Sequence, residues 1–155
     1  MFIISYRARI ERAGPDEFIV RFPDLPEALT SGATGEEALS NAADALATAV
    51  EGYLDAGTDL PRPLEAGPDE VAVVLDPKLA ARMLLRRVMT EQNVSGRALA
   101  QRMGRDEKQV RRVLTGRGAT LNLTLDALRA LGVRPGLAAP GLEREVDGAP
   151  ALVEA

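Results

Sequence analysis

The charged residues of this chain are sorted along the sequence. Residues 1–77 carry 5 Arg and no Lys against 15 Asp and Glu, a net charge of −10, whereas residues 78–136 carry 13 Lys and Arg against 4 acids, a net of +9. Residues 137–155 contribute −3, which gives the overall net charge of −4. The middle segment alone carries enough positive charge to bind phosphate. We expect the acidic segment to repel nucleic acid or to attract a basic partner.

The composition argues against several classes of site. The chain has no Cys and no His, and therefore no disulfide, no thiolate ligand and no histidine base. No spacing supports a Ser/Lys site or a catalytic carboxylate pair, so we expect no catalytic residue, no metal, no cofactor and no enzyme activity. No signal peptide is evident, and no apolar run approaches the roughly 20 residues of a membrane helix. These features predict a soluble, cytoplasmic protein that does not contact a membrane.

The acidic segment has the pattern of strands around one helix. Residues 2–10 alternate between apolar and polar, residues 18–22 repeat that pattern after a turn, and residues 29–31 allow a short third strand. The unbroken apolar run 71–75 is interpreted as a strand buried on both faces. The predicted order is β-β-β-α-β, an α+β unit.

The helix of this unit is expected over residues 35–56. Thr34 and Glu37 form a capping box, in which the Thr34 hydroxyl accepts from the Glu37 N–H and the Glu37 side chain reaches back to the N-terminus. Gly57 is expected to end the helix. The apolar stripe comprises Leu39, Ala42, Leu46, Val50, Tyr53 and Leu54.

The basic segment has the pattern of four helices. Asp76 as N-cap and Pro77 in the first turn begin a helix over 78–92. Further helices are expected over 96–103, over 107–115, and from a cap at Thr120 or Asn122 to Leu131. The expected caps and stops are Ser95, Gly104, Asp106, Gly116 and Gly132. We expect an N-terminal domain over 1–76, an all-α domain over 77–134 and a flexible tail over 135–155.

The segment SGRALAQRMGRDEKQVRRVLTG is typical of a helix-turn-helix. Leu99 and Ala100 would face the partner helix, Gly104 permits the turn, and Val110 with Val113 or Leu114 would anchor the next helix. An exposed helix face that is positive overall suits the major groove of double-stranded DNA. That outward face consists of Glu107, Lys108, Arg111, Arg112 and Thr115. The alternative is a four-helix bundle with a solvated arginine face.

Residues 79–133 resemble the Cro/phage-repressor helix-turn-helix family. The resemblance implies that Glu107, Lys108 and Arg112 approach base edges, with Arg111 on the same face. It also implies phosphate contacts by Ser95, Arg97, Gln109 and Arg117. The family often has Gln just after the first cap, where this chain has Gly96.

Such domains usually form homo-oligomers on two-fold operators, here a dimer or a tetramer. Helix 121–131 is one candidate for the dimer surface. In the alternative interpretation, its leucines are intramolecular core: Leu121, Leu125, Leu128 and Leu131.

The string FPDLPEALTSGATGEEALSNAADAL, followed by LPRP and VAVVL, resembles the HicB family of antitoxins over about residues 4–77. The resemblance implies a partial RNase H-like fold and binding of a small, basic, RNA-cleaving toxin called HicA. Many members also repress their own operon through a C-terminal DNA-binding domain.

Two residues of the FPDLPEA segment are candidate toxin contacts, Asp24 and Glu27. At the position of Glu27, members of the family commonly have Gly. For Asp24 a plain turn role is weighted equally. Glu36 and Glu37 are expected to serve the cap and the helix dipole. The alternative function is an orphan transcriptional regulator whose N-terminal domain binds a small ligand or another protein.

Overall fold

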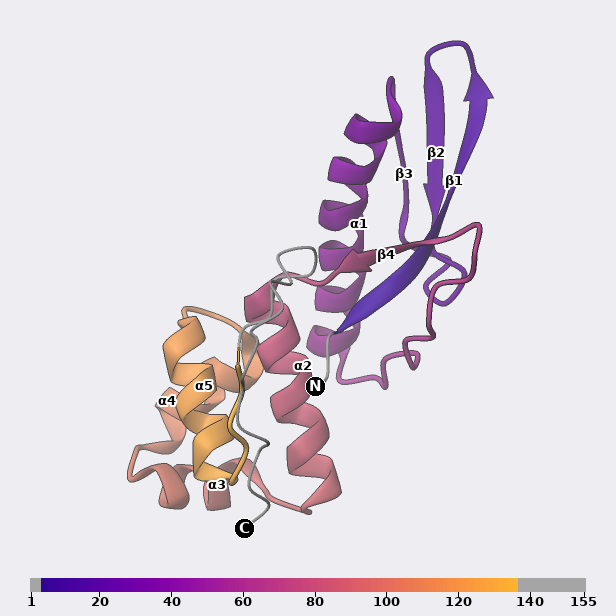
Figure 1. The fold of residues 1–155 in the computed structure, drawn as a ribbon. Helices are drawn as coiled ribbons and strands as arrows, with labels where there is room; N and C mark the ends of the chain where they lie inside the picture. The colour runs from indigo at the N-terminus through magenta and orange to yellow at the C-terminus, as the bar shows by residue number, and fades with distance from the viewer. Residues whose placement is uncertain (1–3, 137–155) are drawn as a thin grey trace, which may run out of the picture.

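The computed structural model describes residues 4–136 and divides them into a sheet-and-helix unit and a helical unit (Figure 1). The first unit contains β1 (Ser5–Gly14), β2 (Glu17–Arg21), β3 (Leu29–Gly32), α1 (Gly35–Ala56) and β4 (Val71–Val74). The strands form one antiparallel sheet in the order β3-β2-β1-β4. This element order confirms the α+β prediction.

Helix α1 covers one face of the sheet and builds an aliphatic core with it. Tyr6 and Ala8 of β1, Val20 of β2, and Leu46 and Val50 of α1 are all fully buried in this cluster. Along β1 the buried residues Tyr6 and Ala8 are two positions apart, because every second side chain of a strand points to the same face. The opposite face of the sheet has no helix over it within the described residues (Figure 1). The core therefore lies on one side of the sheet only.

The prediction that residues 71–75 are buried on both faces is wrong. Val73 and Leu75 are buried, but Val71 and Val74 are 37% and 47% exposed. β4 pairs only with β1 and is an edge strand of an antiparallel sheet. An apolar run indicates a central strand only where helices cover both faces, and only one face is covered here.

The capping box of α1 is confirmed, with one difference. The Thr34 hydroxyl accepts from the Glu37 N–H at 3.1 Å, while the Glu37 carboxylate accepts from the N–H of Ala33 rather than from that of Thr34. Ala38 is fully buried where Leu39 was expected. The reason is a close approach, since a Cβ built on Gly32 of β3 would lie 2.4 Å from the Ala38 nitrogen.

Up to residue 136, the helical unit contains four helices, as predicted: α2 (Pro77–Glu91), α3 (Gly96–Met103), α4 (Glu107–Thr115) and α5 (Leu121–Ala130). The N-caps are Asp76, Ser95, Asp106 and Thr120, which decides against Asn122. Gly104, Gly116 and Gly132 adopt the left-handed conformation that helix ends commonly require. None of the helices in the described part of the chain is long and apolar enough to cross a membrane.

A second cluster of buried side chains lies within the helical unit, and all four leucines of the α5 region contribute to it. Leu128 and Leu131 are buried, and Leu121 and Leu125 pack against the cluster while partly exposed. This favours the intramolecular interpretation of α5. Leu79 of α2 belongs instead to the core under α1, so α2 contributes to both units. Of the tail expected over 135–155, residues 137–155 lie outside the described residues.

Candidate functional sites

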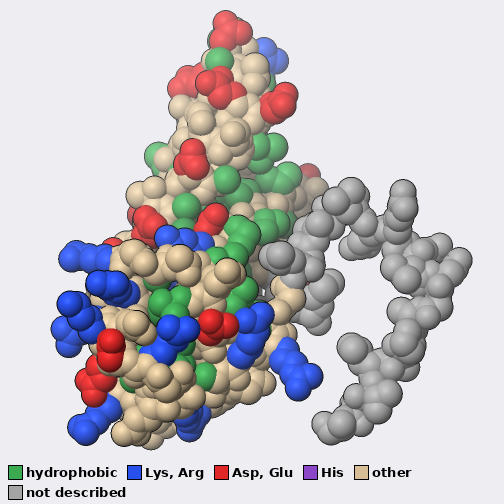
Figure 2. All heavy atoms as spheres, turned by 90° about the vertical axis from the view of Figure 1, so that its left-hand side faces the viewer, with side chains coloured by type: hydrophobic (Ala, Val, Ile, Leu, Met, Phe, Trp, Pro, Cys, Tyr) green, Lys and Arg blue, Asp and Glu red, His purple; other side chains and the backbone are tan. Residues whose placement is uncertain are grey.

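The two units carry opposite charge on their surfaces. On the face drawn in Figure 2, acidic side chains predominate over the sheet-and-helix unit, and Lys and Arg side chains predominate over the helical unit. Helix α1 contributes five acids and no basic residue to this pattern. The segregation seen along the sequence is therefore also a segregation in space.

Helices α3 and α4 form the candidate nucleic-acid surface. The Ser95 hydroxyl accepts from the N–H of Ala98 at 3.1 Å, and the Asp106 carboxylate accepts from the N–H of Gln109 at 2.8 Å. Val110 and Val113 are each 1% exposed and fix α4 against the helical core. The choice left open between Val113 and Leu114 thus falls on Val113, since Leu114 is only half-buried.

The structure leaves most of the predicted contact residues of this surface exposed. Lys108, Arg111 and Arg112 are exposed on α4, and Arg117 follows it. Ser95 is exposed at the start of α3, and its hydroxyl proton is still available to donate because the cap uses the oxygen as acceptor. Gln109 is half-buried beside Arg105, whose Nη1 lies 3.4 Å from the Gln109 Oε1. Arg105, exposed in the turn before α4, received no individual role from the sequence pattern.

Two of the predicted contact residues face each other. Arg97 Nε lies 3.6 Å from Glu107 Oε1, and both side chains are well exposed, at 77% and 67%. An exposed pair of this kind contributes little to stability and is easily exchanged for other partners. Both groups remain accessible from solvent.

The FPDLPEA segment forms two consecutive turns. The N–H of Leu25 donates to Phe22 O, and the N–H of Ala28 donates to Leu25 O. Pro23 and Pro26 therefore occupy the second position of each four-residue turn. Within the described residues, Asn93 is the only non-glycine residue with positive φ. Glu27 therefore occupies its turn without the positive φ that would call for glycine.

Asp24 is held by Arg7 of β1. Arg7 donates from Nε and Nη2 to the two carboxylate oxygens at 3.1 and 3.0 Å, and the Asp24 side chain is only 10% exposed. This hydrogen bond to Asp24 is the main reason that the pKa of Arg7 is raised. The geometry thus gives Asp24 a structural partner within its own chain.

Glu70, just before β4, extends this network. Its carboxylate accepts from the N–H of Gly67 at 3.0 Å and from Arg9 Nε at 2.9 Å, and it lies 3.6 Å from Arg7 Nη1. The hydrogen bond from Gly67, with smaller contributions from Arg9 and Arg7, lowers the pKa of Glu70. The network ties the connector that precedes β4 to the open face of the sheet.

Glu27, the other candidate toxin contact, is exposed at the end of the second turn. Its hydrogen bond with the Tyr53 hydroxyl raises the pKa of Tyr53 and connects this turn to α1. Tyr6 lies in the core below, where burial, assisted by Asp24 and Tyr53, raises its pKa to about 12. The Tyr6 hydroxyl donates to Pro61 O at 2.9 Å.

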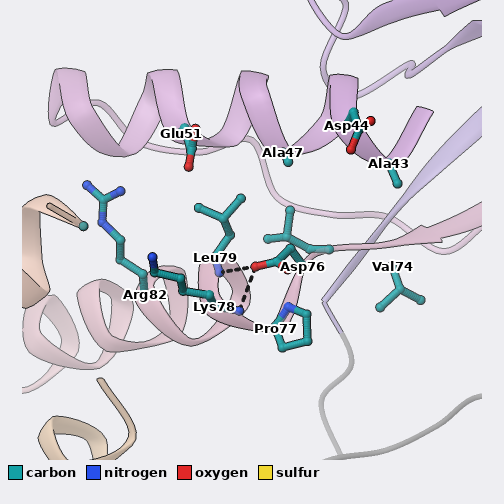
Figure 3. Close-up of a pocket in the computed structure, with 12 residues that line it drawn as sticks. Ala43, Asp44, Ala47, Glu51, Val74, Asp76, Pro77, Lys78, Leu79 and Arg82 are labelled. Carbon is teal, nitrogen blue, oxygen red and sulfur yellow. Dashed lines mark hydrogen bonds between the residues drawn. The ribbon is translucent and has the colours of Figure 1, made fainter. Parts of the chain in front are cut away.

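A groove of about 520 Å³ separates α1 from the start of α2 (Figure 3). Asp44 and Glu51 of α1 lie on one wall, and Lys78 and Arg82 of α2 lie on the other. Within residues 4–136, no group of acidic residues could hold a metal ion. The sequence pattern did not single out Arg82, which is 7% exposed.

Comparison with known proteins places these surfaces in context. A family model for the HicB-like antitoxin of bacterial toxin–antitoxin systems matches residues 5–83. Antitoxin HicB 2 of Photorhabdus laumondii is 38% identical over 114 residues, covering 73% of this chain and 81% of the relative. Antitoxin HicB 1 of the same bacterium is 38% identical over 122 residues, or 77% of each chain. Antitoxin HicB of Escherichia coli K12 is 29% identical over 130 residues, covering 83% of this chain and 94% of the relative. These alignments are longer than the region matched by the family model, so the similarity extends into the helical unit.

Proposed function

Since the chain belongs to the HicB-like antitoxins of bacterial toxin–antitoxin systems, we propose that it neutralises a HicA-type RNA-cleaving toxin by direct binding and represses its own operon by binding promoter DNA. In this proposal, the sheet-and-helix unit, with a partial RNase H-like fold, binds the toxin. The helical unit binds DNA as a helix-turn-helix. The chain itself catalyses nothing.

The observation that carries the DNA-binding half is the geometry of α4. The helix buries Val110 and Val113 and presents Lys108, Arg111 and Arg112 to solvent. A helix anchored by one face and positive on the other fits the major groove, with α3 crossing the DNA backbone. Contacts of these Lys and Arg side chains with phosphate would release counterions and supply much of the affinity.

Charge complementarity supports the toxin-binding half. The sheet-and-helix unit is strongly acidic, and an RNA-cleaving toxin needs a basic surface to hold its substrate. Opposite charges on two partners raise the rate of encounter and exclude like-charged competitors. Acidic groups on this unit would also keep it away from DNA while the helical unit is bound.

Co-expression tests the proposal. The full chain is produced together with the candidate toxin, a short basic protein to be sought in the reading frames beside its gene, and growth and co-purification are scored. We expect growth to be rescued and a complex to be recovered. A folded chain that neither rescues growth nor co-purifies with this protein would refute the toxin-binding half and favour an orphan regulator.

A doubly substituted full chain, Lys108→Ala with Arg112→Ala, separates the two activities. It should still rescue growth, because neither residue lies in the acidic unit, but it should lose repression of a reporter placed behind the natural promoter. A reporter that stays repressed would show that α4 is not the DNA-binding helix.

A further inference from the structure

Two arginines one turn apart on α2 bind the C-terminal ends of two different helices. Arg82 Nε donates to Leu114 O of α4 at 3.1 Å, and Arg86 Nη1 donates to Leu54 O of α1 at 3.1 Å. Both carbonyls lie among the last four of their helices, which have no acceptor role inside the helix. α2 therefore connects the end of the acidic helix to the end of the proposed DNA-reading helix.

Arg82 also makes an ion pair with the acidic unit. Its Nη2 lies 2.8 Å from Asp55 Oδ1 in the last turn of α1. That turn contains an acid and no basic residue, although a helix C-terminus favours positive charge. Arg82 and Arg86 supply the positive charge from α2, and Figure 3 shows Arg82 rising from α2 toward α1.

The Arg82 guanidinium packs closely against the C-terminal end of α4. Gly116, the C-cap of α4, has φ +72°, and a Cβ built on it would lie 2.6 Å from Arg82 Nη1. The Arg82 side chain is only 8% exposed, and its charge is compensated by Leu114 O and by Asp55, whose own side chain is 64% exposed. A nearly buried charge that loses its ionic partner is strongly disfavoured and shifts to find another.

We propose that Arg82 is a positioning residue for α4, and that Asp55 of the acidic unit fixes Arg82 in place. The acidic unit thereby contributes to reading DNA through an ion pair, without touching the DNA. This inference rests on the proposed DNA-binding function. The ion pair between Arg82 and Asp55 thus has a role in DNA binding as well as in holding α2 against α1.

The test compares two variants that each remove one negative charge but should change the affinity for DNA differently. In the full chain, Asp55→Asn is compared with Asp59→Asn, which removes the same charge from an exposed residue four positions along. Affinity is measured for a duplex carrying the DNA immediately upstream of this gene and for a random duplex of equal length. Asp59→Asn should leave both affinities unchanged or slightly tighter, since one negative charge is gone. Asp55→Asn should weaken binding to the upstream duplex about 5-fold or more, a common size for coupling between sites, and leave the random duplex unaffected.

Three further variants distinguish positioning from general stability. Asp55→Glu should restore the preference for the upstream duplex, because it can re-form the ion pair. The double variant Asp55→Asn with Arg82→Gln should be no worse than Arg82→Gln alone, since both changes break one connection. Circular dichroism and Tm are measured for every variant.

The outcomes separate the inference from the function it rests on. If the unsubstituted chain does not prefer the upstream duplex, the proposed DNA-binding function fails. If the unsubstituted chain shows that preference but Asp55→Asn behaves like Asp59→Asn, the positioning role of Arg82 is wrong. Equal weakening on both duplexes together with a lowered Tm would also overturn it, because that result indicates stability alone.

Discussion

Arg7 binds Asp24 through two parallel hydrogen bonds of 3.0 and 3.1 Å, and so joins the first strand to the turn that follows the second. Paired geometry of this kind is stronger and more directional than a single contact. The carboxylate of Asp24 is thereby committed within the chain. The pair holds the FPDLPEA turns against the sheet.

Replacing Asp24 with Asn should therefore lower Tm by several degrees, because it removes one charge from a mostly buried ion pair. Asp16→Asn, which removes the same charge from an exposed turn residue, is the matched control and should change Tm little. Thermal unfolding followed by circular dichroism measures both. If the two variants melt alike while only Asp24→Asn loses the toxin, Asp24 is a partner contact and not a structural residue.

The lowered pKa of Glu70 predicts a dependence of stability on acid. A carboxyl whose pKa is lower folded than unfolded stabilises the fold fully above its ordinary value of 4.5, and this stabilisation is lost as pH falls through the lower folded value. Urea unfolding from neutral pH to about pH 3 should show the free energy of unfolding decreasing on the acid side.

Glu70→Gln should be less stable than the unsubstituted chain at neutral pH, and the difference should shrink at acid pH. Glu65→Gln, which changes an exposed acid of the same connector, serves as control. A difference that stays constant with pH would show that ionisation of Glu70 is unimportant.

Elements set by local chemistry were predictable from the sequence, and those set by distant partners were not. Thr34, Ser95 and Asp106 cap helices because their side chains reach an N–H three residues along, so short motifs reveal them. The edge position of β4 depends on which strands pair, which its apolar run does not encode. Arg82 likewise gave no signal, because its partners lie 27 and 32 residues away.

The candidate sites divide in the same way. The outward face of α4 follows from helical period and charge, and the structure places Lys108, Arg111 and Arg112 where that pattern predicts. Arg7 gives Asp24 a partner within the chain that the sequence pattern did not indicate, and a contact of Asp24 with the toxin stays a prediction. The expected boundary at residue 76 stays a prediction, although Leu79 of α2 packs in the core under α1.

Gly32→Ala should be strongly destabilising, because the added methyl would meet the backbone of α1 and not a movable side chain. Overpacking of this kind typically costs about 1–3 kcal/mol and occasionally more. Gly35→Ala is the control, since nothing lies within 4 Å of its Cβ position. Equal urea midpoints for the two variants would contradict the close packing of β3 on α1.

Arg112→Ala and Arg97→Ala should affect DNA binding differently. Loss of a base contact costs about 1–3 kcal/mol on the specific site and little on random DNA, whereas loss of a phosphate contact weakens both similarly. We assign Arg112 to the first class and Arg97 to the second. Affinities for the upstream duplex and a random duplex check this, and identical behaviour of the two variants would mean that the roles are wrongly assigned.

The most direct test of the account is the salt dependence of the affinity of the full chain for the DNA upstream of its own gene. Although the whole chain has a net charge of −4, the basic surface should dominate, so the logarithm of the affinity should fall linearly with the logarithm of salt concentration. Each phosphate contact should contribute about 0.9 to the slope, and several contacts are expected. An affinity that does not change with salt would contradict the claim that the helical unit binds DNA through its segregated positive charge.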